Sequence, residues 1–333
     1  MEIVLDSYGS SLSRDKDGFV AVSDGGRQRI PAAGIDRIRI SPGTQITSDA
    51  VLLAIENEIE IIFADRRGRP MGLLWSPRYG SISTIRKGQL AFSSSKDAAI
   101  WISDVIAQKV MNQQTLILAL CGRDDLRVYV SQSVSALAGI ADRIRELSGE
   151  SVSEISQELR GLEGQAAHVY FSMMNLCLPE KLRFESRSQH PATDTTNAFL
   201  NYAYGMLYSC IEGALIRAGI DPYIGILHMD DYCRPVLVFD VIELYRTWAD
   251  RVVYTLLSQE LETDDLCSVR EDGAFWLESL GRRILSQSVN DYLDEVVTEN
   301  GVKRSRRTSI ELYAQALAQK FKGYANDNDR KPE

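Results

Sequence analysis

The period of the hydrophobic pattern changes once along this chain, and that change limits the folds open to it. Up to about residue 80, short runs of alternating polar and apolar residues are separated by turn signals such as Asp24-Gly25-Gly26. Such alternation is typical of β-strands, and several strands of this kind indicate a small sandwich or open sheet. From about residue 93, apolar residues recur at spacings of three and four, the period of an α-helix. We therefore expect an α+β protein with a small β-sandwich-like domain at residues 1–83, a linker at 84–94, an all-α domain at 95–322 and a disordered polar tail at 323–333.

Charge and cysteine content narrow the class of protein. The 333 residues carry a formal net charge of −9, which argues against a surface coated with nucleic acid but leaves room for a local basic groove. The five cysteines are scattered without a C-x-x-C pair, so we expect free thiols rather than a zinc site or a disulfide framework. The chain starts without a signal-peptide pattern, and no segment is long and apolar enough to cross a bilayer, so we expect a cytoplasmic protein without membrane contact.

One histidine and two carboxylates stand out against apolar surroundings. His228 lies twelve residues before Asp240, and Glu243 follows three residues later on a helix predicted over 234–261. Side chains three apart on a helix share a face, and carboxylates among apolar neighbours are costly unless a positive group neutralises them. That group is either a bound cation or Arg246, one turn further on. The simpler alternatives are a solvated carboxylate pair and a hydrogen-bonded core histidine.

A third carboxylate, Glu163, lies between two glycines of another predicted helix. Gly161 and Gly164 each cost about 0.5–1 kcal/mol relative to alanine, which suggests that a second backbone or a ligand approaches there. Ordinary helix packing beside a solvated Glu163 explains the same pattern. Carboxylate oxygens with one imidazole nitrogen suit Mg²⁺ or, better, Mn²⁺, and such an ion polarises a phosphate oxygen and activates a hydroxyl.

Three segments carry these residues in an order and spacing that resemble one protein family. They are similar to the Glu-Gly segment, the Asn-rich helix with its metal-site histidine, and the acidic helix of the CRISPR-associated protein one family, the spacer-acquisition integrases. In this chain they read LEGQAAHVYF, NAFLNYAYGMLYSCIEGALIRAGIDPYIGILH and LVFDVIELYR. The β-then-helical layout matches as well, so the resemblance spans nearly the whole chain. The chain departs from the family at Thr247, where many relatives have proline, and at His168, where arginine is common.

The resemblance implies a role for each site residue. The ligands of an Mg²⁺ or Mn²⁺ ion would be Glu163, His228 and Glu243, with Asp240 completing the catalytic set. Arg246 is similar to the basic residue that contacts DNA near the site. Four further side chains would line or support the DNA-binding site: Tyr170, Asn197, Asn201 and Tyr204. We expect the basic run VKRSRR to contribute phosphate contacts through Lys303, Arg304 and Arg306.

The resemblance also implies a metal-dependent DNA integrase and endonuclease of antiviral defence. The 3′-hydroxyl of a captured DNA fragment would attack a phosphodiester at the edge of a CRISPR repeat and so insert the fragment into the array. The implied partners are both DNAs, a second copy of the chain paired through the β domain, and CRISPR-associated protein two, which bridges two such dimers. Two alternatives stay open: a stand-alone metal-dependent nuclease of branched DNA or repair intermediates, and a non-catalytic DNA-binding assembly subunit.

Overall fold

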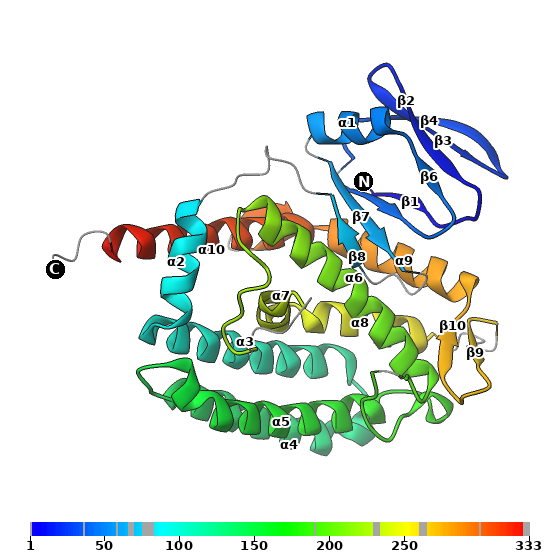
Figure 1. Ribbon diagram of the computed structural model, residues 1–333. Helices are drawn as coiled ribbons and strands as arrows, with labels where there is room; N and C mark the ends of the chain where they lie inside the picture. Colours follow the sequence, from blue (N-terminus) through cyan, green and yellow to red (C-terminus); the bar gives the residue numbers. More distant parts are fainter. Residues whose placement is uncertain are drawn as a thin grey trace. The chain divides into compact units, whose positions relative to one another are not determined.

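The computed structural model describes residues 2–35, 37–57, 59–65, 70–74, 83–189, 191–228, 234–259, 265–299 and 301–328. The chain divides into two compact units, Met1–Ser81 and Ile82–Glu333. The first unit is rich in strands and the second is mostly helical, which confirms the expected α+β class (Figure 1).

The first unit contains two four-stranded sheets. One has the order β1-β5-β7-β8, in which only β8 runs antiparallel to its neighbour. The other has the order β4-β3-β2-β6, an antiparallel meander to which β6 adds in parallel. The elements are β1 (Glu2–Leu5), β2 (Ser11–Asp15), β3 (Gly18–Ser23), β4 (Gly26–Pro31), β5 (Arg37–Ile40), β6 (Gln45–Ile46), α1 (Ser48–Glu56), β7 (Glu60–Ala64) and β8 (Pro70–Leu73).

Apolar side chains from both sheets meet in one core. Ile38 of β5 and Ile61 of β7 belong to the same buried cluster as Leu12 of β2 and Phe19 of β3, and none of the four is exposed. Leu53 of α1 joins the same cluster. The alternating pattern in the sequence therefore produces two sheets that each turn an apolar face to a common interior, as in a sandwich.

The second unit is built around helices whose apolar stripes form a larger core. Helix α3 packs against α4 and α5 and also contacts α8, so it lies between the α4–α5 pair and α8 (Figure 1). This position brings α3 beside the segments that carry all three carboxylates singled out above. The elements are α2 (Ser83–Ser93), α3 (Lys96–Leu120), α4 (Arg127–Glu146), α5 (Val152–Leu176), α6 (Thr195–Arg217), α7 (Val236–Val241), the 3-10 turn η3 (Ile242–Leu244), α8 (Arg246–Leu257), β9 (Cys267–Val269), β10 (Phe275–Leu277), α9 (Ser279–Asp294), β11 (Val296–Glu299), β12 (Val302–Ser305) and α10 (Arg306–Asn328), with short 3-10 turns at Asp124–Leu126 and Glu180–Leu182.

The segment 84–94 is not a linker: it forms helix α2. Ile85, Gly88 and Phe92 follow helical spacing and are buried. The ring centroids of Phe92 and of Phe321 in α10 are 5.2 Å apart. A Cβ atom at Gly88 would lie 1.7 Å from the Phe321 carbonyl oxygen, so the glycine allows the two helix backbones to touch. The intervening polar residues concealed this short apolar stripe in the sequence.

The C-terminal part differs from the expectation in two ways. Helix α10 continues to Asn328, so the predicted disordered tail is wrong over residues 323–328, and residues 329–333 lie outside the described ranges. Two short antiparallel hairpins, β9–β10 and β11–β12, interrupt a domain that was expected to be all helical.

The expectation of free thiols is wrong for two cysteines. Cys121 ends α3, Cys177 ends α5, and a disulfide joins them across a sequence separation of 56 residues. Cys210 and Cys267 are free, and Cys233 lies outside the described residues. Scattered spacing gave no sign of the pairing, because two helix ends far apart in sequence come together only in the folded unit.

The helix predicted over 234–261 is broken at η3. The segment IELYRTW at 242–248 contains no glycine or proline, so no helix-breaking residue causes the break. Instead, the backbone N–H of Trp248 donates to Tyr245 and not to Leu244. The released Leu244 carbonyl accepts from the Asn112 amide of α3 at 2.9 Å. A tertiary contact thus replaces a helical hydrogen bond at the end of η3. Asp240 and Glu243 both lie before this point and contact different partners, described below.

Candidate metal centre

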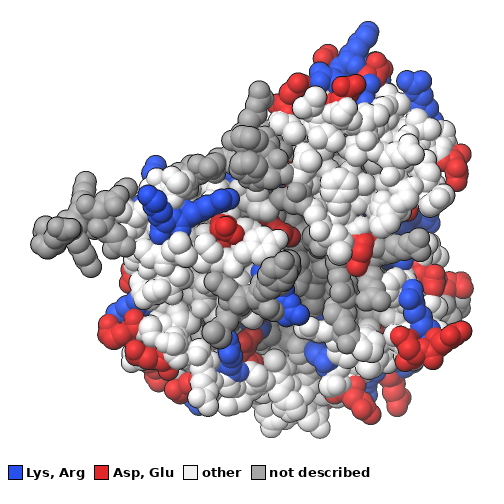
Figure 2. Space-filling view, in the orientation of Figure 1, with Lys and Arg blue, Asp and Glu red and all other residues white. Residues whose placement is uncertain are grey.

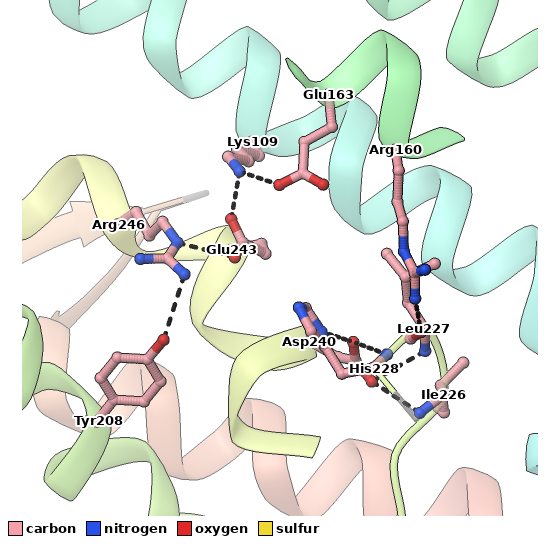
Figure 3. A network of polar contacts seen from close by, with 10 residues as sticks. All are labelled: Lys109, Arg160, Glu163, Tyr208, Ile226, Leu227, His228, Asp240, Glu243 and Arg246. Atoms are coloured by element: carbon pink, nitrogen blue, oxygen red, sulfur yellow. Dashed lines mark hydrogen bonds and ion pairs between the residues drawn. The ribbon is translucent and has the colours of Figure 1, made fainter. Parts of the chain in front are cut away.

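Two carboxylates from different elements meet at one buried ammonium group (Figure 3). The Lys109 Nζ of α3 lies 2.5 Å from Glu163 Oε1 of α5 and 2.6 Å from Glu243 Oε2 of η3. The side chains of Lys109 and Glu243 are 8% and 3% exposed, whereas Glu163 is 25% exposed. One cation therefore bridges the two carboxylates, with its open side next to Glu163.

The charges at this point stabilise one another. Burial alone would raise the pKa of Glu243, but the positive charges of Arg246 and Lys109 outweigh it and hold the pKa at about 2. Burial alone would lower the pKa of Lys109, but the charges of Glu243 and Glu163 outweigh it and raise the pKa above its ordinary value. Both carboxylate and ammonium are ionised at neutral pH, so the cluster is an ionic site rather than a neutral hydrogen-bonded one.

Arg246 fixes the second oxygen of Glu243. Its Nε donates to Glu243 Oε1 at 2.8 Å, and its outer nitrogen donates to the Tyr208 hydroxyl at 3.3 Å. The guanidinium lies over the Tyr204 ring, 5.0 Å from the centroid. Because both tyrosines belong to α6, Arg246 ties the start of α8 to that helix and holds Glu243 in one orientation.

His228 is held by a carboxylate that has no exposed surface. Asp240 Oδ1 lies 2.7 Å from His228 Nδ1 and also accepts the His228 backbone N–H at 3.2 Å. Asp240 Oδ2 accepts the N–H groups of Ile226 at 2.8 Å and Leu227 at 3.2 Å. An ionised carboxylate only accepts, so the ring donates from Nδ1, and Nε2 is the ring nitrogen left for another partner. Both oxygens of Asp240 are therefore directed at the histidine segment, and its predicted place in the catalytic set stays a prediction.

Two further contacts fix the path of the chain into His228. Arg160, one turn before Glu163 on α5, donates to the Leu227 carbonyl at 2.8 Å. A Cβ atom at Gly225 would lie 2.1 Å from the His228 carbonyl oxygen, so no other residue fits that turn without displacement. By contrast, no protein atom lies within 4 Å of where a Cβ would stand on Gly161 or Gly164, so no second backbone approaches Glu163 there, and the approach of a ligand stays a prediction.

The donor set suits a hard or borderline divalent cation. In the described ranges, no three His, Cys, Asp or Glu side chains are close enough together to hold a metal ion as they stand. Glu163 and Glu243 nevertheless converge on a single position where a positive charge sits. His228, with a buried carboxylate on Nδ1 and a lone pair on Nε2, has the arrangement that metal-binding histidines show. Glu163 and Glu243 therefore offer the donor types of the ion that the sequence predicts, whereas no contact among the described residues joins His228 to either of them.

Two tyrosines predicted at the DNA interface are buried instead. Tyr170 is 0% and Tyr204 is 7% exposed, and their hydroxyls donate to the two oxygens of Asp250 at 2.8 and 2.5 Å. Burial, followed by the charge of Asp250, raises the pKa of both tyrosines well above the ordinary value. Burial also raises the pKa of Asp250, against the effect of these hydrogen bonds. Tyr170 therefore has no surface available to DNA in this structure, and a supporting role for the two tyrosines stays a prediction.

The two predicted asparagines hold a loop. Asn197 has no exposed surface: its amide donates to the Ser186 carbonyl at 2.9 Å and to Asp194, and its oxygen accepts from Arg187 and from the Ser188 N–H. The oxygen of Asn201 accepts from the same arginine at 3.0 Å. Asn197 is therefore fully engaged inside the protein, and Asn201 is largely engaged with the loop at residues 187–189; their support of the DNA-binding site stays a prediction.

The basic run after α9 contains side chains of different availability. Lys303 on β12 is exposed and Arg304 is half-buried. Arg306 donates to the Tyr292 carbonyl and to Glu295 and lies 3.7 Å from the Tyr292 ring centroid, so it stabilises the end of α9. On the face shown in Figure 2, basic and acidic residues alternate along the lower rim of the helical unit. DNA contact by this run, and by Arg246, stays a prediction.

Sequence reasoning missed Lys109, Arg160, Arg187 and Asp250. Lys109 carried a readable signal, because it continues the buried stripe of Ile102 and Ile106 on α3. A charged residue on such a stripe needs a partner of opposite charge. Asp250 carried the same signal, because it lies on the buried stripe of Val253 and Leu257 on α8, whereas Arg160 and Arg187 gave none.

Comparisons with known proteins agree with the sequence resemblance. The family described as "CRISPR associated protein Cas1" matches residues 3–291. An Archaeoglobus fulgidus protein named "CRISPR-associated endonuclease Cas1 1" is 29% identical over 97% of each chain. A Methanobrevibacter ruminantium protein named "CRISPR-associated protein Cas1 3" is 30% identical over 80% of this chain and 81% of its own.

Solved structures share the fold. A Cas1 protein from Thermotoga maritima superposes with a TM-score of 0.78 at 20% identity, covering 97% of each chain. A casposase bound to an integration product gives a TM-score of 0.79 at 19% identity over 97% of this chain and 90% of that one. A Cas6-RT-Cas1–Cas2 complex gives 0.78 at 22% identity, covering 97% of this chain and 35% of the larger one. The sequence match over most of its length shows that this chain belongs to the Cas1 family of CRISPR-associated proteins.

Proposed function

We propose that this protein is a metal-dependent DNA integrase and endonuclease that inserts captured DNA into a CRISPR array. One observation carries the proposal: Glu163 and Glu243 converge on one cation, in a fold that also presents a histidine oriented by a buried aspartate. The names of the relatives, which include endonucleases, and the casposase fold support this reaction class.

The residues divide into ligands and the groups that position them. Glu163, Glu243 and the Nε2 of His228 would hold an Mg²⁺ or Mn²⁺ ion. When bound, that ion supplies charge stabilisation at the phosphate and at the attacking and leaving oxygens. Asp240 keeps the histidine in the Nδ1–H tautomer, and Arg246 orients Glu243.

The proposed reaction exchanges one phosphodiester for another. The 3′-hydroxyl oxygen of the captured fragment forms a bond to a repeat phosphorus, the bond from that phosphorus to the repeat's 3′ oxygen breaks, and the proton passes from the attacking to the leaving oxygen. No oxidant or nucleotide cofactor is consumed. Because one bond replaces another of the same type, the site also runs in reverse or accepts water, which gives endonuclease activity.

Partners follow from the same relatives. A complex that contains Cas1 and Cas2 shares the fold, and we propose that this chain pairs with itself through its strand-rich unit and is bridged by a Cas2 partner. Exposed basic residues such as Lys303 would contact DNA phosphates.

A strand-transfer assay tests the proposal. Protein with and without the Cas2 partner receives a short duplex and a supercoiled plasmid carrying a repeat, in Mn²⁺ or Mg²⁺. Glu163→Gln should reduce joining by about 100-fold or more. The matched control is Glu158→Gln, the same change at an exposed position of the same helix, which should leave joining unchanged. Cleavage without joining would favour a stand-alone nuclease, and joining that survives Glu163→Gln and His228→Asn would remove the proposed site.

A further inference from the structure

The ammonium group of Lys109 occupies the point at which the two carboxylates converge. It lies 2.5 Å from Glu163 and 2.6 Å from Glu243, and only 8% of the side chain is exposed (Figure 3). Carboxylate oxygens directed at one centre from two different elements are the ligands that a divalent cation takes. The lysine therefore stands where the proposed function requires an ion.

Counting charges shows that the lysine and a divalent ion exclude each other. Glu163 and Glu243 contribute two negative charges, and Lys109 and Arg246 contribute two positive ones. The buried cluster is neutral as it stands. A divalent ion added to this set would leave two uncompensated positive charges in a poorly hydrated place, which is strongly unfavourable. One of the two resident cations has to withdraw before the ion binds.

The contacts decide which cation withdraws. Arg246 keeps the Tyr208 hydroxyl and the faces of two tyrosine rings as partners when Glu243 turns to another cation. Within the described part of the chain, the ion-pair partners of the Lys109 ammonium are the two carboxylates themselves. Its four-carbon stem is flexible, and the partly exposed side of Glu163 leaves it a way out.

The backbone around the lysine stays in place when the ammonium moves. Asn112, one turn further along α3, holds the Leu244 carbonyl at 2.9 Å independently of Lys109. Helix α3 and η3 therefore remain joined, and the exchange needs only a change of side-chain rotamer.

We propose that Lys109 is a resident cation that keeps the site closed in the metal-free protein and is exchanged for the divalent ion on activation. This inference rests on the proposed function, because it assumes that Glu163 and Glu243 bind a metal. It assigns Lys109 two effects: it stabilises the metal-free fold, and it weakens metal binding by competing for the same two carboxylates.

The test measures metal affinity rather than activity. Mn²⁺ binding to the full chain is followed by calorimetry and by the electron paramagnetic resonance signal of free Mn²⁺, for wild type, Lys109→Gln and Lys96→Gln. Lys96 is the matched control, since it is the first residue of the same helix, α3, and its exposed side chain pairs with a carboxylate, that of Glu150. Lys109→Gln should bind Mn²⁺ about tenfold more tightly than wild type, because a competing ligand is removed. It should also unfold at a lower temperature without metal and gain more from added Mn²⁺.

A second measurement needs only the wild-type chain. Acetylation of lysines read by mass spectrometry should leave Lys109 protected without metal and label it once Mn²⁺ is added. The proposal is overturned when Lys109→Gln binds Mn²⁺ as wild type does or more weakly, or when Mn²⁺ does not change labelling at Lys109. Glu163→Gln distinguishes failure of the lysine exchange from failure of the metal site. If one of the results above is obtained but Glu163→Gln loses Mn²⁺ binding, the metal site stands and only the exchange is rejected. An absence of Mn²⁺ binding in wild type overturns the proposed function together with the exchange.

Discussion

Replacing Asp240 by asparagine changes one atom and tests the orientation of His228. In the wild type, one carboxylate oxygen accepts from the Ile226 and Leu227 N–H groups, and the other accepts from the His228 N–H and the His228 ring. An asparagine amide offers an acceptor to only one of these pairs and a donor to the other. In the preferred orientation, the amide oxygen takes the place of Asp240 Oδ2 and accepts the Ile226 and Leu227 N–H groups. The NH₂ group then faces His228.

The cost follows from these four contacts. One backbone N–H loses its acceptor, at about 1–3 kcal/mol, and the two remaining bonds lose the charge of the acceptor, at roughly 1 kcal/mol each. The free energy of unfolding should therefore fall by about 3–5 kcal/mol, a large share of the 5–15 kcal/mol typical of a folded domain. The NH₂ group also forces Nδ1 of the ring to accept, so the ring proton moves to Nε2 and occupies the lone pair that a metal needs. We expect Mn²⁺ affinity to fall roughly 10- to 100-fold.

Two measurements check this reasoning. Urea unfolding gives the change in the free energy of unfolding, with Asp104→Asn as the control, because Asp104 is exposed on α3 and its substitution should cost less than about 0.5 kcal/mol. Nitrogen-15 NMR of the imidazoles gives the tautomer, and the chain has only three histidines to assign. Wild-type stability in Asp240→Asn, or a ring proton that stays on Nδ1, would refute the argument.

Three further substitutions have defined outcomes. Gly225→Ala should lower joining activity and stability, because its Cβ meets a carbonyl oxygen at 2.1 Å; activity and urea unfolding at wild-type values would contradict this. Cys177→Ser, which frees Cys121, should lower the free energy of unfolding by roughly 4 kcal/mol for a loop closed across 56 residues, and thiol titration of the denatured wild type should show that pair oxidised. Tyr204→Phe should flatten the loss of stability above pH 10. The folded state keeps the Tyr204 proton beside Asp250 while the unfolded chain releases it, so the stability that Tyr204 contributes is present below pH 10 and falls by about 1.4 kcal/mol per pH unit above it, in addition to the similar loss from Tyr170; equal slopes in urea unfolding of wild type and variant would exclude this cause.

The fold class could be predicted because it depends on local periodicity. Alternating and helical patterns are properties of neighbouring residues, and they separated the two units before any contact was known. Helix α2 was missed because its stripe holds few apolar residues and depends on Gly88, whose value appears only when α10 lies against it.

The candidate site could be predicted in its residue types but not in its geometry. Apolar neighbours marked His228 and Glu243 as unusual, flanking glycines marked Glu163, and the family resemblance joined the three. The partner of Glu243, Lys109, and the partner of the Leu244 carbonyl, Asn112, both lie on α3, more than a hundred positions earlier in the sequence. Long-range hydrogen bonds of this kind leave no mark on periodicity. The same reason hid the burial of Tyr170 under Asp250.

Asn197 shows how a residue can be irreplaceable without touching a substrate. Its amide group uses two donors and two acceptor positions on four different groups, all inside the protein. Aspartate lacks the donors, glutamine is too long by one methylene, and leucine would remove all four hydrogen bonds. A saturation-mutagenesis map of this protein would therefore score Asn197 as intolerant as a metal ligand. Such a map alone would place Asn197, which only holds a loop, in the same class as residues that bind the metal. Counting the hydrogen bonds that each intolerant side chain makes inside the protein separates the two classes.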